Sequence, residues 1–291
     1  MKKLLAIFLM LFISNSFASL TFSTFNIRNF DDASHATDVD KLRELLLEVD
    51  ADLFGLQEIV DVKDFQKLTK RLPGYQFVAS HCGGGGKQKL GYLYKTEKLN
   101  LLSVEEIAEI GNLDSSSAAC GSLRPIFKAL FQTNDGQEFY AMNVHLKAGS
   151  GTRNYSRRHD QYDILEHYMI EAQKELKNLV VFGDFNTTGY SLRDQDYQAF
   201  VRMVEGSNIQ DLGKDLECTS YWTGPNRRSR YHQGSVLDHI LMTESFLGKR
   251  VEEIALHGHC KKMECKDATV SELGDIYDRV SDHCPLAATI K

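Results

Sequence analysis

The chain has 291 residues, 42% of them hydrophobic, which is enough apolar material for one large core. Its formal net charge is −6. An acidic protein does not attract polyanions through its overall electric field, so a polyanionic substrate would have to be held by local basic patches and a metal ion.

The first 18 residues are typical of a secretory signal peptide. Lys2 and Lys3 precede an apolar run from Leu4 to Ile13, and Ser16-Phe17-Ala18 is a small-x-small cleavage signature. The apolar run is too short to span a bilayer. We therefore predict that residues 1–18 are removed, which lowers the net charge from −6 to −8 by the loss of two lysines. Residues 19–291 are expected to form one domain, a secreted monomer (periplasmic or extracellular) without stable membrane association.

The first half of that domain reads as short strands separated by two helices. Apolar residues at helical spacing predict a helix over Val39–Val49, and a second helix is predicted over Val62–Leu72, ended by Pro73-Gly74. Apolar runs typical of strands are Leu20–Ile27, Leu53–Leu56, Tyr75–Ala79 and Gly91–Tyr94. The glycines at 83–86 are not followed by the residues of a P-loop.

The second half continues this alternation. The Asp-Gly turn at 135–136 predicts a hairpin between Ile126–Gln132 and Glu138–Leu146. A helix is predicted over 158–177, and the remaining strand-like runs are Leu179–Phe182, Leu237–Met242 and Ala287–Ile290. By itself this order of elements suits a doubly wound parallel sheet as well as a layered sandwich.

Six cysteines remain after the signal peptide: Cys82, Cys120, Cys218, Cys260, Cys265 and Cys284. In an oxidising compartment an even number predicts up to three disulfides, and the sequence leaves all fifteen pairings open. The alternative is a zinc site made by His257, His259, Cys260 and Cys265. Their spacing matches no standard zinc finger, and export favours disulfides.

Polar residues recur where apolar runs end. They are Asn26, the pair Gln57-Glu58, His145, Gly183-Asp184-Phe185-Asn186 and Ser281-Asp282-His283. Carboxylate oxygens suit a hard cation, and in-line attack on a phosphate ester needs a base on one side and charge stabilisation on the other. The pattern predicts metal-assisted hydrolysis of a phosphate ester.

Taken in order with Leu237-Asp238-His239, these motifs resemble the endonuclease/exonuclease/phosphatase superfamily. Within it, the chain is most similar to secreted nucleases related to pancreatic-type deoxyribonuclease. The resemblance covers Leu20 to Ile290 and implies a four-layered αββα sandwich, in which two mixed, mainly antiparallel sheets face each other and helices lie outside. It also implies that loops at one end of the sandwich carry the active site.

The resemblance implies a role for each motif residue. Glu58 would bind Mg²⁺ (or Mn²⁺) with Asn26 and Asp282 beside it, and a structural Ca²⁺ would be compatible with the family. Asp184 would be the general base, and Asn186 would hold the phosphate or the attacking water. The remaining roles are charge stabilisation or leaving-group protonation by His145 and His283, orientation of His283 by Asp238, and phosphate contact by Arg124.

Two basic clusters are candidates for substrate contact, although each could equally be a solvated loop. Arg227, Arg228 and Arg230 precede Asp238, and Arg153, Arg157, Arg158 and His159 follow His145.

The resulting hypothesis is a secreted, sequence-tolerant nuclease acting on DNA, with RNA as a further candidate substrate. Two alternatives stay open: a sphingomyelinase-like phospholipid phosphodiesterase, and a non-catalytic exported nucleic-acid-binding protein. A serine hydrolase is excluded because the chain contains no Gly-x-Ser-x-Gly motif.

Overall fold

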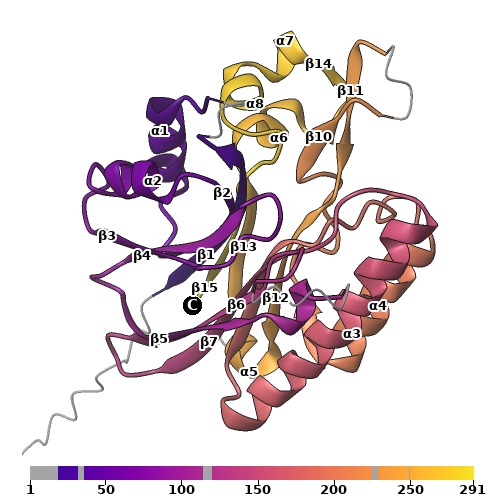
Figure 1. The fold of residues 1–291 in the computed structure, drawn as a ribbon. Coiled ribbons are helices and arrows are strands. Elements are labelled where there is room, and N and C mark those ends of the chain that lie inside the picture. The colour runs from indigo at the N-terminus through magenta and orange to yellow at the C-terminus, as the bar shows by residue number, and fades with distance from the viewer. Residues whose placement is uncertain (1–18, 32–35, 114–119, 225–228, 249) are drawn as a thin grey trace, which may run out of the picture.

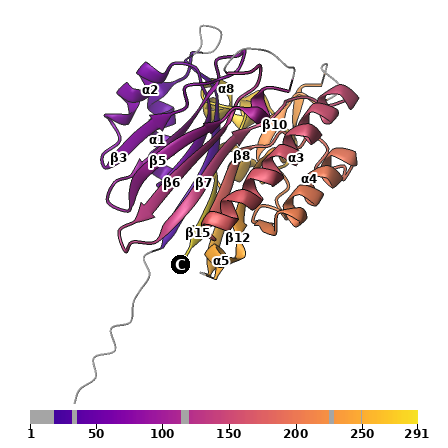
Figure 2. The ribbon, with the colours of Figure 1, turned by 60° about the horizontal axis from the view of Figure 1, so that its bottom comes forward.

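Two six-stranded β-sheets face each other and helices cover their outer faces (Figure 1). The computed structural model describes residues 19–31, 36–113, 120–224, 229–248 and 250–291. The predicted signal peptide lies outside these ranges. The four layers, helices, sheet, sheet and helices, confirm the predicted αββα sandwich (Figure 2).

The first sheet has the strand order β13-β15-β1-β2-β4-β3. Its strands are β1 (Leu20–Phe30), β2 (Leu53–Ile59), β3 (Tyr75–Ala79), β4 (Lys89–Lys95), β13 (Val251–Leu256) and β15 (Leu286–Ile290). Its outer face packs against α1 (Val39–Val49) and α2 (Val62–Thr69). In α1 the apolar residues at helical spacing are the buried ones, as the sequence predicts, and Asp38 caps the helix by accepting a hydrogen bond from the Lys41 amide.

The second sheet has the order β5-β6-β7-β8-β12-β9. Its strands are β5 (Leu99–Ile107), β6 (Ile126–Thr133), β7 (Glu138–His145), β8 (Leu179–Asp184), β9 (Ile209–Asp211) and β12 (Asp238–Thr243). Its outer face packs against α3 (Thr152–Glu175) and α4 (Gln195–Gly206). The β6–β7 hairpin forms in the predicted place, with Phe127 opposite Asn143 and Gln132 opposite Glu138.

The core between the sheets is rich in aromatic side chains. Residues of β7 alternate as predicted: Phe139 and Ala141 face the other sheet, whereas Met142 and Val144 face α3 and α4. Phe22 packs edge-on against Phe139 with ring centroids 5.7 Å apart. Burial of these rings is the main stabilising contribution to the sheet–sheet contact.

A smaller lobe lies above the open end of the sandwich. It contains a three-stranded sheet in the order β10-β11-β14 and several short helices. The strands are β10 (Ser220–Trp222), β11 (Tyr231–Ser235) and β14 (Ala268–Thr269). The helices are α6 (Gly258–Met263), α7 (Val270–Leu273) and α8 (Asp275–Arg279), while α5 (Glu244–Leu247) and the 3-10 turn η1 (Glu109–Gly111) lie elsewhere in the chain.

Three disulfides join all six cysteines, which confirms the predicted bridges. The pairs are Cys82–Cys120, Cys218–Cys265 and Cys260–Cys284. The zinc alternative is wrong, because Cys260 and Cys265 are each committed to a disulfide. Two bridges hold the small lobe, and each removes chain entropy from the unfolded state worth about 2–4 kcal/mol.

Several element boundaries differ from the sequence prediction. Helix α2 ends at Thr69, because the amides of Arg71 and Leu72 donate to the carbonyls three residues back, Leu68 and Thr69, and the chain leaves the helix in a turn. Helix α3 begins at Thr152, six residues before the predicted start. Strand β5 was not predicted, since it is an edge strand with a register shift between Leu101 and Ser103 that interrupts its alternation. None of the helices in the described part of the chain is both long and apolar enough to cross a membrane.

Candidate active site

Two pairs of parallel strands end at the same edge of the sandwich and bring the polar motifs together. In the pair β1–β2, Asn26 lies opposite Gln57, and in the pair β7–β8, His145 lies opposite Asp184. Strand β12 runs antiparallel to β8 and begins at the site, with Asp238 opposite Asp184. The site is therefore a direct consequence of strand register.

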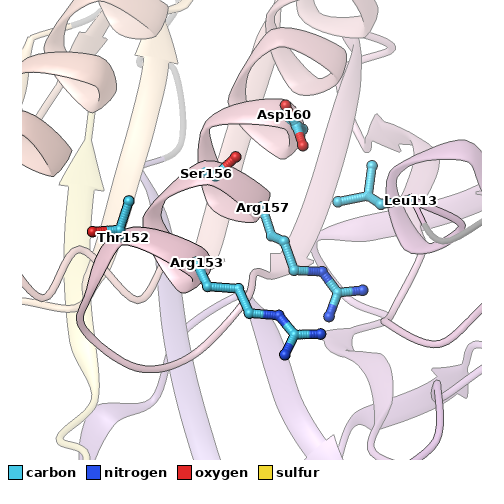
Figure 3. Close-up of a pocket in the computed structure, with 6 residues that line it drawn as sticks. All are labelled: Leu113, Thr152, Arg153, Ser156, Arg157 and Asp160. Atoms are coloured by element: carbon cyan, nitrogen blue, oxygen red, sulfur yellow. The ribbon is translucent and has the colours of Figure 1, made fainter.

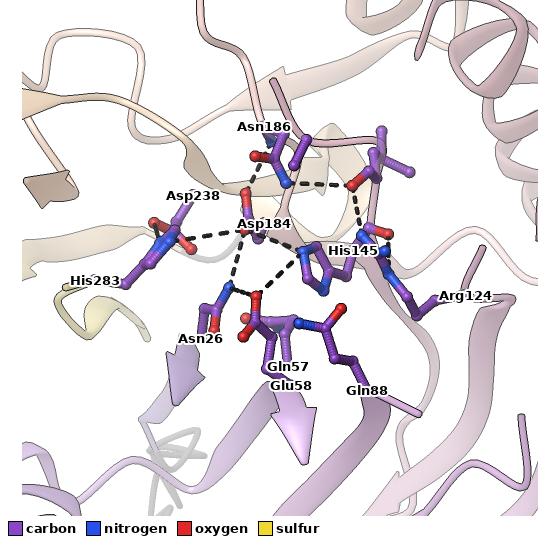
Figure 4. Close-up of polar contacts among 12 residues, drawn as sticks. Asn26, Gln57, Glu58, Gln88, Arg124, His145, Asp184, Asn186, Asp238 and His283 are labelled. Carbon is purple, nitrogen blue, oxygen red and sulfur yellow. Dashed lines mark hydrogen bonds and ion pairs between the residues drawn. The ribbon is translucent and has the colours of Figure 1, made fainter. Parts of the chain in front are cut away.

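The amide of Asn26 links the two carboxylates that the sheets contribute. Its Nδ2 donates to Glu58 Oε1 (3.1 Å) and to Asp184 Oδ2 (3.0 Å). His145 Nε2 lies 3.6 Å from the same Glu58 oxygen and 3.4 Å from the same Asp184 oxygen. Figure 4 shows these side chains converging on one point from opposite sheets.

A second histidine approaches Asp184 from the other side. His283 Nδ1 lies 2.8 Å from Asp238 Oδ2, and its Nε2 lies 3.8 Å from Asp184 Oδ2. The Thr219 hydroxyl accepts from the Asp238 amide, and the Ser281 hydroxyl accepts from the His283 amide. Asp238 thus orients the imidazole of His283 and fixes which ring nitrogen faces Asp184.

The site contains titratable groups with shifted pKa values. Burial raises the pKa of Asp184 to about 7; His283 opposes the shift and Asp238 adds to it. Burial lowers the pKa of His145 well below its usual value, and the nearby charge of Arg124 lowers it further. Burial would also lower the pKa of His283, but the carboxylates of Asp238 and Asp184 outweigh it and raise that pKa well above its usual value. One neutral and one cationic imidazole therefore flank Asp184 at neutral pH.

The backbone at the site adopts uncommon conformations. Glu58 has φ of 65° and Asn186 has φ of 53°, the left-handed region that non-glycine residues seldom occupy and that is concentrated at functional sites. At Gly183 (φ 151°), a Cβ atom would meet the Val144 carbonyl oxygen at 2.0 Å. Glycine is therefore required immediately before Asp184.

A buried amide pair beneath the site was not recognised as important from the sequence. Gln57 Nε2 donates to Asn143 Oδ1 (2.8 Å) across the two sheets, and Asn143 Nδ2 donates to the Leu56 and Gly91 carbonyls. Both side chains are fully buried. The pair fixes the relative position of the sheets directly below Glu58 and His145. Its sequence signal was a polar residue inside each apolar strand.

Two predicted residues lie at the edge of the cluster. Arg124 is buried, and its Nε and Nη2 donate to the carbonyls of His145 (3.0 Å) and Leu146 (2.6 Å), so it holds the His145 backbone. Asp282 lies in a bend with its Oδ1 3.9 Å from Arg28 Nε, and it is not among the potential ligand atoms grouped around Asp184. We therefore leave Asp282 out of the proposed metal ligands.

Asn186 lies within the cluster of site residues, whereas His239 lies behind it. The backbone amide of Asn186 donates to Asp184 Oδ1 (2.9 Å), and its Nδ2 donates to the Leu146 carbonyl (3.2 Å). His239 is fully buried and contacts Asp211 Oδ2 (3.0 Å) and Thr187 Oγ1 (2.9 Å). Asn186 thus lies in the cluster, while His239 is a structural residue behind it.

The predicted basic clusters occupy different positions. Arg227 and Arg228 lie outside the described residues, and Arg230 lies on the small-lobe ribbon with its guanidinium donating to the Tyr231 hydroxyl. In the other cluster, Arg158 is buried in an ion pair with Asp196 (2.7 Å). Arg153 and Arg157 instead line an open hollow along α3, with Leu113, Thr152, Ser156 and Asp160 (Figure 3).

The residues at the centre of the site fit a divalent cation. Ligand atoms of Glu58, His145 and Asp184 lie within 4.8 Å of one another, as do those of Asp184, Asp238 and His283. Asp238 Oδ1 and His145 Nδ1 are buried without a hydrogen-bond partner. The carboxylate oxygens of this group are donors that Mg²⁺ or Mn²⁺ accepts.

Comparison with known proteins shows the family to which the chain belongs. The model of the Endonuclease/Exonuclease/phosphatase family matches residues 23–283, so the chain belongs to that family, whose members hydrolyse phosphodiesters or phosphate monoesters. No curated protein sequence matches the chain.

Solved structures agree on the fold at low sequence identity. TDP2 of D. rerio in complex with a single-stranded DNA product is 19% identical, with a TM-score of 0.64, over 94% of this chain and 99% of that one. A family protein of Bacteroides vulgatus is 19% identical (TM-score 0.65, 94% and 99% coverage). A mannosyl-6-phosphatase of Bacteroides thetaiotaomicron is 18% identical (TM-score 0.63, 94% and 99% coverage). These likenesses define the fold, and substrates differ among the neighbours.

Proposed function

We propose that the protein is a secreted, metal-dependent nuclease that hydrolyses phosphodiester bonds of DNA, with RNA as a further candidate substrate. The observation that carries the proposal is the convergence of Glu58, Asp184, His145 and the His283–Asp238 pair on one point. This set offers cation ligands, a base and two imidazoles within contact distance of a single phosphate.

In this proposal each residue has a distinct task. Glu58, with Asn26 beside it, would hold the cation, which supplies charge neutralisation on the phosphoryl oxygens when bound. Asp184 accepts the proton of the attacking water, and its raised pKa of about 7 suits a base at neutral pH.

The two histidines act on different oxygens of the reacting phosphate. As the water oxygen bonds to phosphorus and the ester bond breaks, His283 donates its proton to the departing oxygen, and Asp238 stabilises the imidazolium. Neutral His145 donates an Nε2 hydrogen bond to a phosphoryl oxygen, a task that requires no change in its protonation.

A polyanionic substrate is favoured by positive charge beside the site. Lys147 follows His145 by two residues; burial lowers its pKa, and the nearby charges of Arg157, Arg124, Arg158 and Arg153 lower it further. The positive charge of these arginines, two of which line the hollow along α3, favours a substrate with several phosphates over a small monoester.

Incubation of the full chain with candidate substrates tests the proposal. Duplex DNA, single-stranded DNA, RNA, sphingomyelin vesicles and a sugar phosphate would each be assayed with Mg²⁺, Mn²⁺ or Ca²⁺, with His283→Ala as the inactive control. We expect cleavage of DNA that is abolished by EDTA. Intact nucleic acid with every metal, together with hydrolysis of the lipid or the sugar phosphate, would contradict it.

A further inference from the structure

Two exposed aromatic side chains lie on the β10–β11 ribbon, and the chemistry proposed above does not use them. Trp222, the only tryptophan of the chain, is 47% exposed, and Tyr231 is 40% exposed. Exposed rings of this size lose favourable burial, so a pair on one small ribbon indicates a binding surface.

Strand register places these rings beside the catalytic histidine. Ser220 lies opposite His283 in an antiparallel bridge, with the Tyr221 amide bonded to the Asp282 carbonyl and the Cys284 amide to the Thr219 carbonyl. Residues directly opposite in such a bridge point to the same face. The face of β10 that carries Ser220 is therefore the face that carries His283.

The same face continues outward to both rings. Trp222 follows Ser220 by two residues, which moves it about 7 Å further along the same face. Gln233 of β11 lies opposite Trp222, and Tyr231, two residues from Gln233, shares its face. We call Ser220, Trp222, Gln233 and Tyr231 the ribbon face; it leads from His283 outward.

The opposite side of the ribbon is firmly anchored. Tyr221 is buried and donates to the Lys266 carbonyl (2.8 Å), and His232 contacts the Tyr277 hydroxyl. The Cys218–Cys265 disulfide joins the start of the ribbon to the segment before β14. The rings are thus presented by a preorganised support, which reduces the entropy cost of binding.

We infer that the ribbon face is a stacking platform for unpaired bases of the nucleic-acid strand whose phosphate occupies the active site. The inference rests on the proposed function and extends it, because it gives the nuclease a preference for single-stranded or locally opened substrate. Every base has a π-face, so two rings can hold a strand without reading its sequence.

Charge and polarity on the ribbon favour a nucleic acid over a lipid surface. The Arg230 guanidinium lies 5.0 Å from the centre of the Tyr231 ring, which adds a cation next to the stacking surface. Gln233 and Ser220 interrupt the apolar surface between the rings and the site. A membrane-inserting hairpin would instead present a continuous apolar tip.

The single tryptophan makes the inference directly measurable. With EDTA present to prevent cleavage, the full chain would be titrated with a short oligothymidylate and with an abasic sugar-phosphate oligomer of equal length and charge. We expect saturable quenching of Trp222 fluorescence by the oligothymidylate and little change with the abasic oligomer. Equal signals from both, no signal from either, or a signal from phosphatidylcholine or sphingomyelin vesicles alone would overturn the inference.

Kinetic variants separate stacking from a structural role. Trp222→Ala should raise the KM for single-stranded DNA about tenfold at nearly unchanged kcat, since one stacked base contributes about that factor. Trp222→Phe should have a KM close to that of the wild type, because its ring can still stack on a base. Tyr231→Ala should weaken the quenching of Trp222 fluorescence by the oligothymidylate. Leu102→Ala is the matched control, because Leu102 is 47% exposed on the edge strand β5.

The outcomes also distinguish this inference from the proposed function. If the wild-type chain cleaves DNA while Trp222→Ala has an unchanged KM and Trp222 is not quenched, the ribbon face is not a binding surface and the nuclease proposal stands. If the chain cleaves no nucleic acid, the nuclease proposal fails, and the metal-free titration still decides whether the ribbon binds bases.

Discussion

The β1–β2 and β7–β8 strand pairs are both parallel, yet they place their acids in different surroundings. Asp184 ends β8 directly opposite His145, whereas Glu58 is the last residue but one of β2 and follows Gln57, which lies opposite Asn26. The Glu58 side chain is 14% exposed, whereas that of Asp184 is 2% exposed and lies between two histidines.

This difference shows how one topology yields two chemical roles. A carboxylate that solvent reaches can take up a hydrated cation and release it. A carboxylate that is buried has its pKa raised, to about 7 for Asp184, and can exchange a proton near neutral pH. The division of labour between acids thus depends on burial and not on strand order.

The largest expected effect comes from removing either carboxylate charge. Glu58→Gln and Asp184→Asn should each lower kcat on DNA by about 10³-fold. The first weakens binding of the cation, and the second removes the general base. Raising the Mg²⁺ concentration should restore part of the activity of Glu58→Gln and none of that of Asp184→Asn. Steady-state rates across a metal titration measure this.

A matched control for both variants is Glu105→Gln, on the edge strand β5, which should keep the wild-type rate. If raised Mg²⁺ restored the kcat of both site variants equally, the two acids would share one role and the proposed difference between them would be wrong.

The polar residues on the first strands of the two pairs, His145 and Asn26, should differ from each other in their effect on kcat. His145→Ala should lower kcat by about 10³-fold, since it removes a hydrogen bond made to the reacting phosphate. Asn26→Ala should lower kcat by about 30-fold, because it loosens two carboxylates through hydrogen bonds to charged groups without touching the substrate. Asn26→Asp should be worse than Asn26→Ala, since a third negative charge would face Glu58 and Asp184. Similar losses for His145→Ala and Asn26→Ala would contradict this ranking.

The smallest effect concerns stability and follows from the burial of Asp184. Its pKa in the folded protein, about 7, lies above its usual value, so its contribution to stability is complete below pH 4 and is lost as the pH rises to 7. In EDTA, the free energy of unfolding of wild type relative to Asp184→Asn should therefore fall across that interval, by up to about 4 kcal/mol.

Urea denaturation of both proteins at several pH values would measure this difference. Titrating groups that do not interact with Asp184 are common to both proteins and cancel in the subtraction. A constant difference in the free energy of unfolding between the two proteins from pH 4 to pH 7.5 would show that burial does not raise the pKa of Asp184.

Local sequence patterns predicted α1, α2, α3 and the central strands of both large sheets, but not α4, β13 or the elements of the small lobe. The apolar spacing of α1, the Asp-Gly turn of the β6–β7 hairpin and the buried run of β8 are properties of neighbouring residues. Strand β5 was missed because its partner lies on only one side and its alternation is broken by a register shift. An edge strand carries a weaker hydrophobic signal than a central strand.

The resemblance to a known family named the acids and histidines, but not their surroundings. The side chain of Asp282 was expected among the metal ligands, yet it lies 3.9 Å from Arg28 Nε and outside the ligand groups at Asp184. The Gln57–Asn143 pair, in contrast, was part of the motifs and received no role. Contacts between sheets depend on packing of segments 86 residues apart, which no local pattern encodes.

The order of strands, helices and reactive residue types is written in the chain itself, because periodicity, turn chemistry and residue identity are local. Only the tertiary structure decided which acid stays near solvent, which histidine is charged, how the cysteines pair and which exposed ring stands beside His283. Those properties depend on burial and on distances between segments far apart in sequence, and folding alone determines both.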